Sequence, residues 1–191
     1  MNERPSPAER YAAAMERQRQ RTPELERFRA TLPFELDPFQ EEACAALERG
    51  RGVLVAAPTG AGKTVVGLFG VHLALARGRT IMYTTPIKAL SNQKYAELRA
   101  LHGEENVGLL TGDVSVNPRA PVIVMTTEVL RNMLYNGSRS LEDLDVVVMD
   151  EVHYLADRFR GPVWEEVIIH LPARVQELEA SLPPLAPAAW S

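Results

Sequence analysis

The stretch Ala57-Pro-Thr-Gly-Ala-Gly-Lys-Thr64 determines the fold that we expect for this 191-residue chain. The apolar residues 52–57 lead into it and predict a buried strand, and the apolar run 65–76 after it has the length of a helix. A glycine-rich turn between a strand and a helix is typical of a phosphate-binding loop, where backbone N–H groups and the positive end of the helix surround an anion. The stretch therefore predicts binding of a nucleoside triphosphate.

The residues of this loop have separate expected roles. The cradle around the phosphates is predicted to consist of Thr59, Gly60, Ala61 and Gly62. The Lys63 amine is expected to reach the β- and γ-phosphates, and the Thr64 hydroxyl to ligate Mg²⁺. Ala57 stands where many such loops carry their first glycine, which is a known variation.

The composition is that of an ordinary globular protein. Apolar residues make up 46% and charged residues 24%, and no apolar run reaches the length that spans a membrane. The single cysteine, Cys44, excludes an internal disulfide and favours a reducing compartment, so we expect a cytoplasmic protein. The net charge of −4 gives no overall positive field for nucleic acid, although a local basic track remains compatible with it.

Three regions are expected along the chain. Residues 1–30 are rich in Arg, Glu and Ala and predict a flexible charged arm, residues 31–176 a folded lobe, and residues 177–191 a proline-rich tail. The lobe opens with a helix for which Asp37 is a good N-cap. Gln40 falls where a capping-box partner belongs, and a role in reading an adenine edge is the alternative.

Strand and helix signals alternate after the phosphate loop. Strands are predicted at residues 80–85, 107–110, 121–126 and 145–150, and helices at 88–101, 128–135 and 161–171. This alternation predicts the α/β class, with a mostly parallel, doubly wound sheet that has helices on both faces.

The last of these strands ends in Asp150-Glu-Val-His153. Ligands of open α/β sheets bind beyond the carboxyl ends of the strands, so Asp150 is expected to face the Mg²⁺ held by Thr64. Glu151 is a candidate to position and deprotonate the attacking water. A solvated turn or helix cap is the structural alternative for the Asp-Glu pair.

Together with residues 57–64, Asp150-Glu-Val-His153 resembles the DExH-box helicases of superfamily two. Further segments resemble the superkiller-like DEVH-box RNA helicases, and among them the actinobacterial HelY type: residues 84–95, 108–113, 125–135 and 160–166. The resemblance covers residues 31–176. It implies a RecA-like P-loop NTPase domain that is the first motor lobe of an ATP-dependent helicase acting on single-stranded RNA, with DNA as the alternative.

The resemblance also implies roles for individual residues. Gln40 would read the adenine, Phe34 would stack on the base, and His153 would couple the ATP site to the next motif. The implied nucleic-acid track consists of Pro86, Lys88, Gly112, Thr127, Glu128 and Arg131. For Thr127 and Glu128, a role in turns and helix caps beside the sheet edge is the alternative explanation.

The resemblance ends after residue 176. The family continues there into a strand that ends in Ser-Ala-Thr, whereas this chain reads Glu177-Leu-Glu-Ala-Ser-Leu-Pro-Pro184. We therefore expect a lobe cut short before this motif, with one side of its sheet unpaired and the second RecA-like lobe missing. We expect little turnover from the 191 residues, because that lobe would supply an arginine finger. The alternatives are an inactive fragment that binds nucleotide or RNA, and another P-loop NTPase.

Overall fold

A seven-stranded sheet forms the centre of the structure, a computed structural model that describes residues 22–58, 60–153, 158, 161–171 and 176–180. The strand order is β1-β7-β6-β2-β5-β3-β4. The strands are β1 (Val53–Val55), β2 (Thr80–Thr85), β3 (Val107–Leu110), β4 (Ser115–Val116), β5 (Val122–Thr126), β6 (Leu144–Met149) and β7 (Gln176–Ala180). Neighbouring strands are parallel except β3 and β4, which confirms the predicted mostly parallel sheet.

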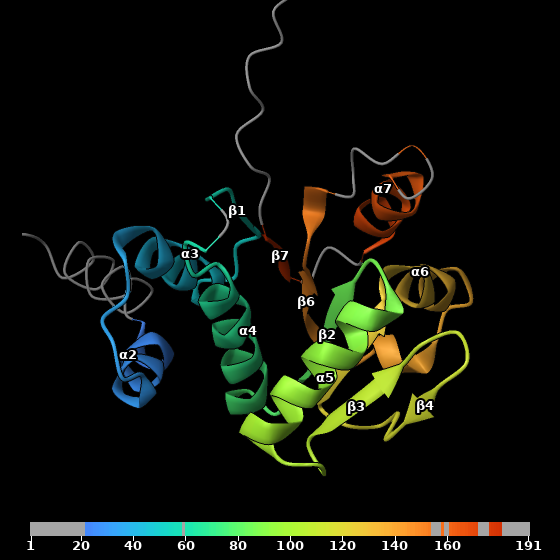
Figure 1. Cartoon of the computed structure of the whole chain (residues 1–191), viewed down its shortest axis with the longest axis horizontal. Coiled ribbons are helices and arrows are strands. Elements are labelled where there is room, and N and C mark those ends of the chain that lie inside the picture. Colours follow the sequence, from blue (N-terminus) through green and yellow to red (C-terminus); the bar gives the residue numbers. More distant parts are fainter. Residues whose placement is uncertain (1–21, 59, 154–157, 159–160, 172–175, 181–191) are drawn as a thin grey trace, which may run out of the picture.

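Helices lie on both faces of this sheet (Figure 1). They are α2 (Pro23–Thr31), α3 (Pro38–Glu48), α4 (Thr64–Ala76), α5 (Lys88–His102), α6 (Thr127–Tyr135) and α7 (Gly161–His170), with a short 3₁₀ turn η1 (Arg139–Leu141). Helices α4 and α5 contact one face of the strands, with α2 and α3 packed outside α4, and α6 and α7 lie together on the other face. The structure therefore has the predicted doubly wound architecture.

Strand β6 shows why a continuous apolar run was a reliable signal. Its side chains alternate between the two faces: Val146 and Val148 pack in the core under α4, whereas Val147 and Met149 pack in the core under α6 and α7. All four are fully buried. A strand covered on both faces has no exposed side on which polar residues are favourable, so residues 146–149 are all apolar. Asp145, near the start of the strand, is only partly buried and pairs with Arg77.

Helix α2 corrects the predicted boundary at residue 30. Its residues Leu25 and Phe28 are buried, and the Phe28 ring packs against Phe69 of α4 with 5.4 Å between centroids. These contacts make the helix part of the folded body, and Pro23 starts it because proline is favourable in the first turn of a helix. Residues 1–21 of the predicted arm lie outside the described residues.

Strand β7 corrects the boundary at residue 177 and the prediction of an unpaired side of the sheet. Residues Gln176–Ala180 pair in parallel with β1 on one side and with β6 on the other. The buried backbone N–H and C=O groups of β1 and β6 need hydrogen-bond partners. The backbone of β7 supplies them, and this pairing does not require an apolar sequence in β7. The rest of the predicted tail, residues 181–191, lies outside the described residues.

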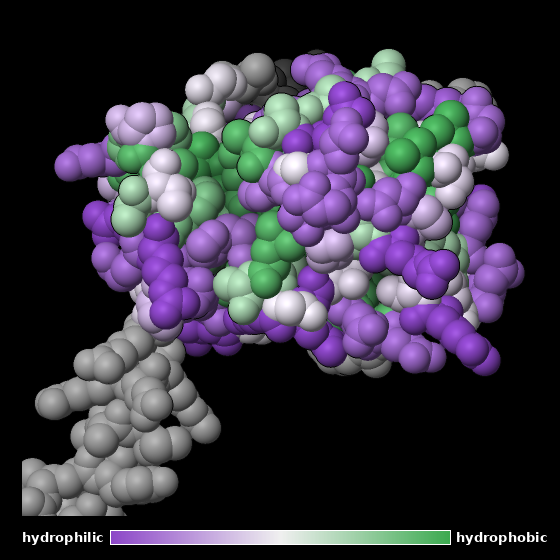
Figure 2. All heavy atoms as spheres, turned by 90° about the horizontal axis from the view of Figure 1, so that it is seen from below, coloured by the Kyte–Doolittle hydropathy of each residue, from purple (hydrophilic) through white to green (hydrophobic). Residues whose placement is uncertain are grey.

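The surface seen from the end where α4 and α5 finish is mostly hydrophilic, with separate apolar patches (Figure 2). Within the part of the chain that the structure describes, no helix has both the length and the apolar character needed to cross a membrane.

Candidate nucleotide site and nucleic-acid track

One edge of the sheet collects most of the predicted functional residues. Strands β1, β2, β3, β5 and β6 run in the same direction, so their carboxyl ends lie at one edge. The phosphate loop follows β1, Lys88 follows β2, Gly112 follows β3, Glu128 follows β5 and Asp150 follows β6. Ligands of open α/β sheets bind at this edge.

The loop has the backbone conformation that a phosphate cradle requires. Gly60 and Gly62 have φ values of +84° and +78°, which favour glycine over residues with a Cβ atom. The Ala61 N–H donates to the Pro58 carbonyl at 3.1 Å and closes the turn, and α4 begins at Thr64. Thr59 lies outside the described residues. The N-terminus of α4 therefore opens directly onto the loop, where its dipole stabilises an anion.

The Lys63 amine lies against the backbone of its own loop. Its Nζ donates to the carbonyl oxygens of Ala57 at 2.7 Å and Pro58 at 2.9 Å. These contacts hold a positive charge at the loop.

Both carboxylate oxygens of Asp150 accept hydrogen bonds. Oδ1 accepts from the backbone N–H of Glu151 at 2.9 Å, and Oδ2 accepts from the Tyr83 hydroxyl at 2.8 Å. The Asp150 N–H donates to the Thr84 carbonyl at 3.0 Å, which extends the pairing of β6 with β2 by one residue. The carboxylate is therefore fixed in direction at the point where the sheet ends.

Tyr83 is a residue of this site that the sequence analysis missed. Its side chain is buried, and burial, followed by the charge of Asp150, raises the pKa of the phenol well above its usual value. The hydroxyl therefore stays protonated and donates to Asp150. A Cβ atom built on Gly67 of α4 would lie 3.3 Å from this hydroxyl, so Tyr83 fills the space between α4 and Asp150. Gly67 lies three residues after Thr64, so Thr64 is on the same face of α4 as the contact with Tyr83.

Glu151 adopts a backbone conformation that is unusual for a residue with a side chain. Its φ is +64°, and its Oε2 atom lies 2.9 Å from Nδ1 of His153. Strain of this kind is tolerated where the surrounding structure imposes it, and it is common at active sites. The imidazole thus orients the carboxylate that we expect to position water.

Gln40 contacts the loop directly. Its Nε2 donates to the Gly62 carbonyl at 3.0 Å, and its Oε1 accepts from the Asp37 N–H at 2.9 Å, which confirms the predicted contact within the capping box. Phe34 is half-exposed and lines a pocket of about 350 Å³ together with Arg29 and Leu36. The described lining of this pocket includes neither Gln40 nor a residue of the loop. The stacking of Phe34 on the base stays a prediction.

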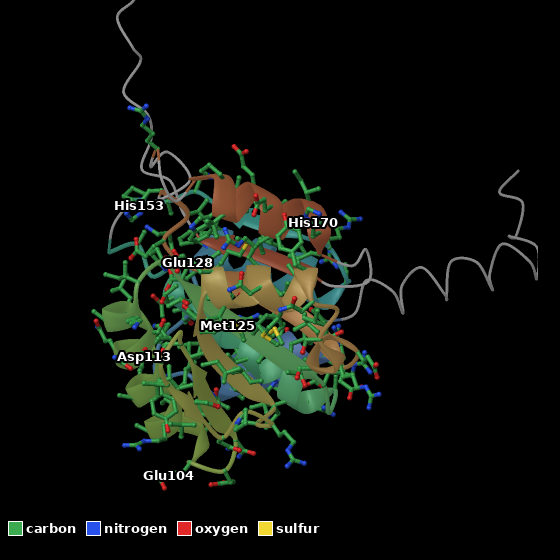
Figure 3. The ribbon with its side chains drawn as sticks, turned by 90° about the vertical axis from the view of Figure 1, so that its right-hand side faces the viewer. Glu104, Asp113, Met125, Glu128, His153 and His170 are labelled. Carbon is green, nitrogen blue, oxygen red and sulfur yellow. The ribbon has the colours of Figure 1, made fainter. Side chains whose placement is uncertain are left out.

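The predicted nucleic-acid residues differ in exposure. Lys88, Gly112 and Glu128 are exposed, and Lys88 Nζ lies 2.7 Å from Asp113 Oδ1. Hydrogen bonds from Lys88 and then from Thr111 hold the pKa of Asp113 below its usual value. Asp113, Glu128 and His153 lie along the same side of the molecule, away from His170 (Figure 3).

The side chains of two other track residues are buried. The Thr127 hydroxyl donates to the Thr85 carbonyl at 3.3 Å. Pro86, which follows Thr85 directly after the end of β2, is also buried. Arg131 is partly buried and lies 3.7 Å from Glu166 of α7. Thr127 thus ties the first residue of α6 to β2, whereas the N-cap position of this helix belongs to Thr126. The predicted contacts of Thr127 with nucleic acid stay a prediction.

Comparison with known proteins gives consistent matches. "Probable helicase HelY" of Mycobacterium tuberculosis is 68% identical over 161 residues, which are 83% of this chain and 18% of that protein. "ATP-dependent RNA helicase mtr4" of Schizosaccharomyces pombe is 55% identical over 74% of this chain and 12% of that protein. The chain therefore spans less than a fifth of the length of these curated relatives.

Solved structures agree with the sequence matches. The Mycobacterium smegmatis helicase Lhr bound to ssDNA and AMP-PNP has a TM-score of 0.62 and 27% identity over 84% of this chain and 24% of that chain. The helicase domain of Pyrococcus furiosus Hef has a TM-score of 0.60 and 28% identity over 78% of this chain and 33% of that chain. The fold is therefore that of a RecA-like helicase lobe, and the DEAD/DEAH box helicase profile matches residues 37–183, so the chain belongs to that family.

Proposed function

We propose that this chain is the ATP-binding first motor lobe of an ATP-dependent DExH-box helicase that acts on single-stranded RNA. The observation that carries the proposal is the position of the phosphate loop and of Asp150-Glu151 at one edge of a parallel sheet. Membership of a helicase family implies that ATP is the nucleotide. A small-molecule kinase or a transporter ATPase has no support from these matches.

The residues at this edge suit Mg²⁺. Thr64 and Asp150 offer hydroxyl and carboxylate oxygens, the hard ligands that Mg²⁺ prefers, and it usually takes only one or two carboxylates besides waters and phosphates. When bound, the ion would neutralise charge on the phosphate oxygens.

The protein's own groups supply the other requirements of phosphoryl transfer. The Lys63 amine and the N–H groups of the loop bind the phosphates, and the N-terminus of α4 adds its dipole. Glu151, oriented by His153, accepts a hydrogen bond from the attacking water and takes its proton. Transfer of a phosphoryl group depends on such positioning and charge stabilisation more than on covalent chemistry.

Exposed groups beside the ATP edge would bind the nucleic acid. Lys88 is the exposed cation at the start of α5, and Gly112 and Glu128 lie beyond the neighbouring strands. Such contacts go mainly to sugar and phosphate and carry no sequence information. We favour RNA because the S. pombe relative is named an RNA helicase, while the Lhr structure holds ssDNA. The cytoplasmic location remains a prediction.

Binding of a fluorescent ATP analogue and of single-stranded RNA to the 191-residue chain tests the proposal. Lys63→Ala should weaken ATP binding about ten- to a hundredfold, because a lost charge-assisted hydrogen bond is worth roughly 1.5–3 kcal/mol. Lys88→Ala is the matched control, since it should weaken RNA binding and leave ATP binding unchanged. Unchanged ATP affinity in a folded Lys63→Ala variant would refute the nucleotide site.

Turnover separates the proposed motor lobe from another P-loop NTPase that hydrolyses ATP without a second lobe. In the helicases that the chain resembles, a second lobe supplies an arginine finger, which is worth on the order of 10³–10⁵ in turnover. We therefore expect ATP binding with hydrolysis near background, with or without RNA. Rapid RNA-stimulated hydrolysis by the monomer would contradict this expectation.

A further inference from the structure

The hydrogen bond between Tyr83 and Asp150 joins two neighbouring strands at the catalytic edge. Tyr83 lies in β2, and Asp150 follows β6 directly. The 2.8 Å separation of the Tyr83 hydroxyl and Asp150 Oδ2 is that of a good O–H···O⁻ hydrogen bond. This bond therefore adds Tyr83 to the groups already assigned to the ATP site.

The Tyr83 ring is fixed on several sides. It is 1% exposed, and its strand pairs with β5 and β6. A Cβ atom on Gly67 would lie 3.3 Å from both the hydroxyl and Cε2 of the ring, so only glycine leaves unhindered room for the ring at this point of α4. Lys94 Nζ lies 5.4 Å from the ring centroid, within the range of a cation–π contact. The hydroxyl therefore has one fixed place, against Asp150.

This contact determines which part of the carboxylate remains for other ligands. Oδ2 accepts from Tyr83 and Oδ1 from the Glu151 N–H, so the carboxylate cannot rotate without losing one of the two bonds. Partners of this kind orient the groups that bind a metal and tune their basicity, and their removal typically costs 10–100-fold in metal affinity or activity.

We propose that Tyr83 is a positioning residue that orients the Asp150 carboxylate for Mg²⁺ through its hydroxyl. The proposal rests on the proposed function, in which Asp150 faces the ion. Strand β2 would then contribute Tyr83 to the ATP site, and it also precedes α5, which begins at Lys88. It also explains why a phenol is buried beside a carboxylate at a point where phenylalanine would fill the same core.

The test compares the wild-type 191-residue chain with Tyr83→Phe, which keeps the ring and removes the hydroxyl. Affinity for a fluorescent non-hydrolysable ATP analogue is measured with Mg²⁺ and with excess EDTA. With Mg²⁺ present, we expect Tyr83→Phe to bind the analogue about 10–100-fold more weakly than the wild type does. In EDTA, we expect the two proteins to have the same affinity. The matched control is Tyr95→Phe on α5, a tyrosine whose ring contacts Arg99, and it should bind as the wild type does.

A purely structural role would give a different result. It would lower the melting temperature and weaken binding equally with Mg²⁺ and with EDTA, and either equal losses or no loss would overturn the proposal. In a double-mutant cycle, Tyr83→Phe should have no further effect on Mg²⁺-supported binding once Asp150→Asn is present. If both Asp150→Asn and Tyr83→Phe match the wild type, the proposed site fails; if Asp150→Asn alone loses Mg²⁺ dependence, only the role of Tyr83 fails.

A second variant covers the case in which Tyr83→Phe does not fold. Gly67→Ala leaves Tyr83 in place and crowds its hydroxyl from α4, in a helix where alanine is otherwise more favourable than glycine. A selective loss of Mg²⁺-supported affinity supports the proposal, and affinity equal to the wild type with Mg²⁺ and with EDTA overturns it.

Discussion

The Gln40 side chain joins the start of α3 to the phosphate loop, because its Nε2 atom donates to the Gly62 carbonyl oxygen at 3.0 Å. The other end of the same amide caps the helix by accepting from the Asp37 N–H at 2.9 Å. The side chain is 4% exposed, so both bonds are shielded from water. Capping and contact with the loop therefore depend on different atoms of one residue and can be separated by mutation.

Gln40→Glu should weaken nucleotide binding while it preserves the cap. A carboxylate can still accept from Asp37, but it places an acceptor against the Gly62 carbonyl, which loses its donor. Loss of this hydrogen bond and repulsion between two acceptors predict a loss of roughly tenfold for ATP and for GTP, measured by equilibrium binding. A larger loss for ATP than for GTP is expected if the amide also reads adenine.

Asp37→Ala provides the control for this prediction. It removes the N-cap side chain, which typically costs about 1 kcal/mol of stability, and leaves the contact between Gln40 and Gly62 in place. It should lower the melting temperature without changing the affinity for either nucleotide. Unchanged affinities in Gln40→Glu would show that the contact with the loop has no role in binding.

Much of this fold could be predicted because its central strands are buried on both faces. Residues 146–149 of β6 and 81–83 of β2 alternate between the two buried faces, so their apolar runs predicted these two strands. The phosphate loop and Asp150 could be predicted as well, since their chemistry requires particular residues directly after particular strands.

The remaining features depend on contacts between distant parts of the chain. Helix α2 buries only Leu25 and Phe28 of its nine residues, which is too weak a pattern to separate from a solvated segment. Strand β7 is defined by pairing with β1 and β6, and its sequence shows no apolar run. The bond between Tyr83 and Asp150 depends on the register of two strands that are 67 positions apart in sequence at this contact, which no local motif encodes.

Glu48→Ala should destabilise the fold by releasing α2. The Glu48 carboxylate accepts from the backbone N–H groups of Glu24 at 3.0 Å and Leu25 at 2.9 Å. These residues are at the N-terminus of α2, where the helix dipole favours a negative charge. Loss of hydrogen bonds to a charged group predicts a decrease of about 1–3 kcal/mol in the free energy of unfolding in urea. Glu42→Ala on the exposed side of α3 is the control and should change it by less than about 0.5 kcal/mol. Equal effects of the two variants would contradict the docking role.

Asp113→Asn should increase the affinity for single-stranded RNA, because Asp113 competes with phosphate for the Lys88 amine at 2.7 Å. Exposed ion pairs are weak, so we expect a gain of at most about fivefold at low salt. The contact with Lys88 holds the pKa of Asp113 below its usual value. Its negative charge therefore persists above pH 4 and is lost only as the pH falls through that lowered pKa, so the effect of the mutation should be constant between about pH 6 and 8.

Two further variants show whether the gain depends on Lys88. Lys88→Ala should weaken RNA binding and reduce the slope of log affinity against log salt by about one, and in that background Asp113→Asn should have little effect. Asp143→Asn is the matched control for net charge, since Asp143 is exposed and pairs with Arg79 just before β2, at the opposite edge of the sheet. If Asp143→Asn raises the affinity as much as Asp113→Asn does, overall charge accounts for the gain. In that case Lys88 is not the group that meets the phosphate, and the track along this edge must be reassigned.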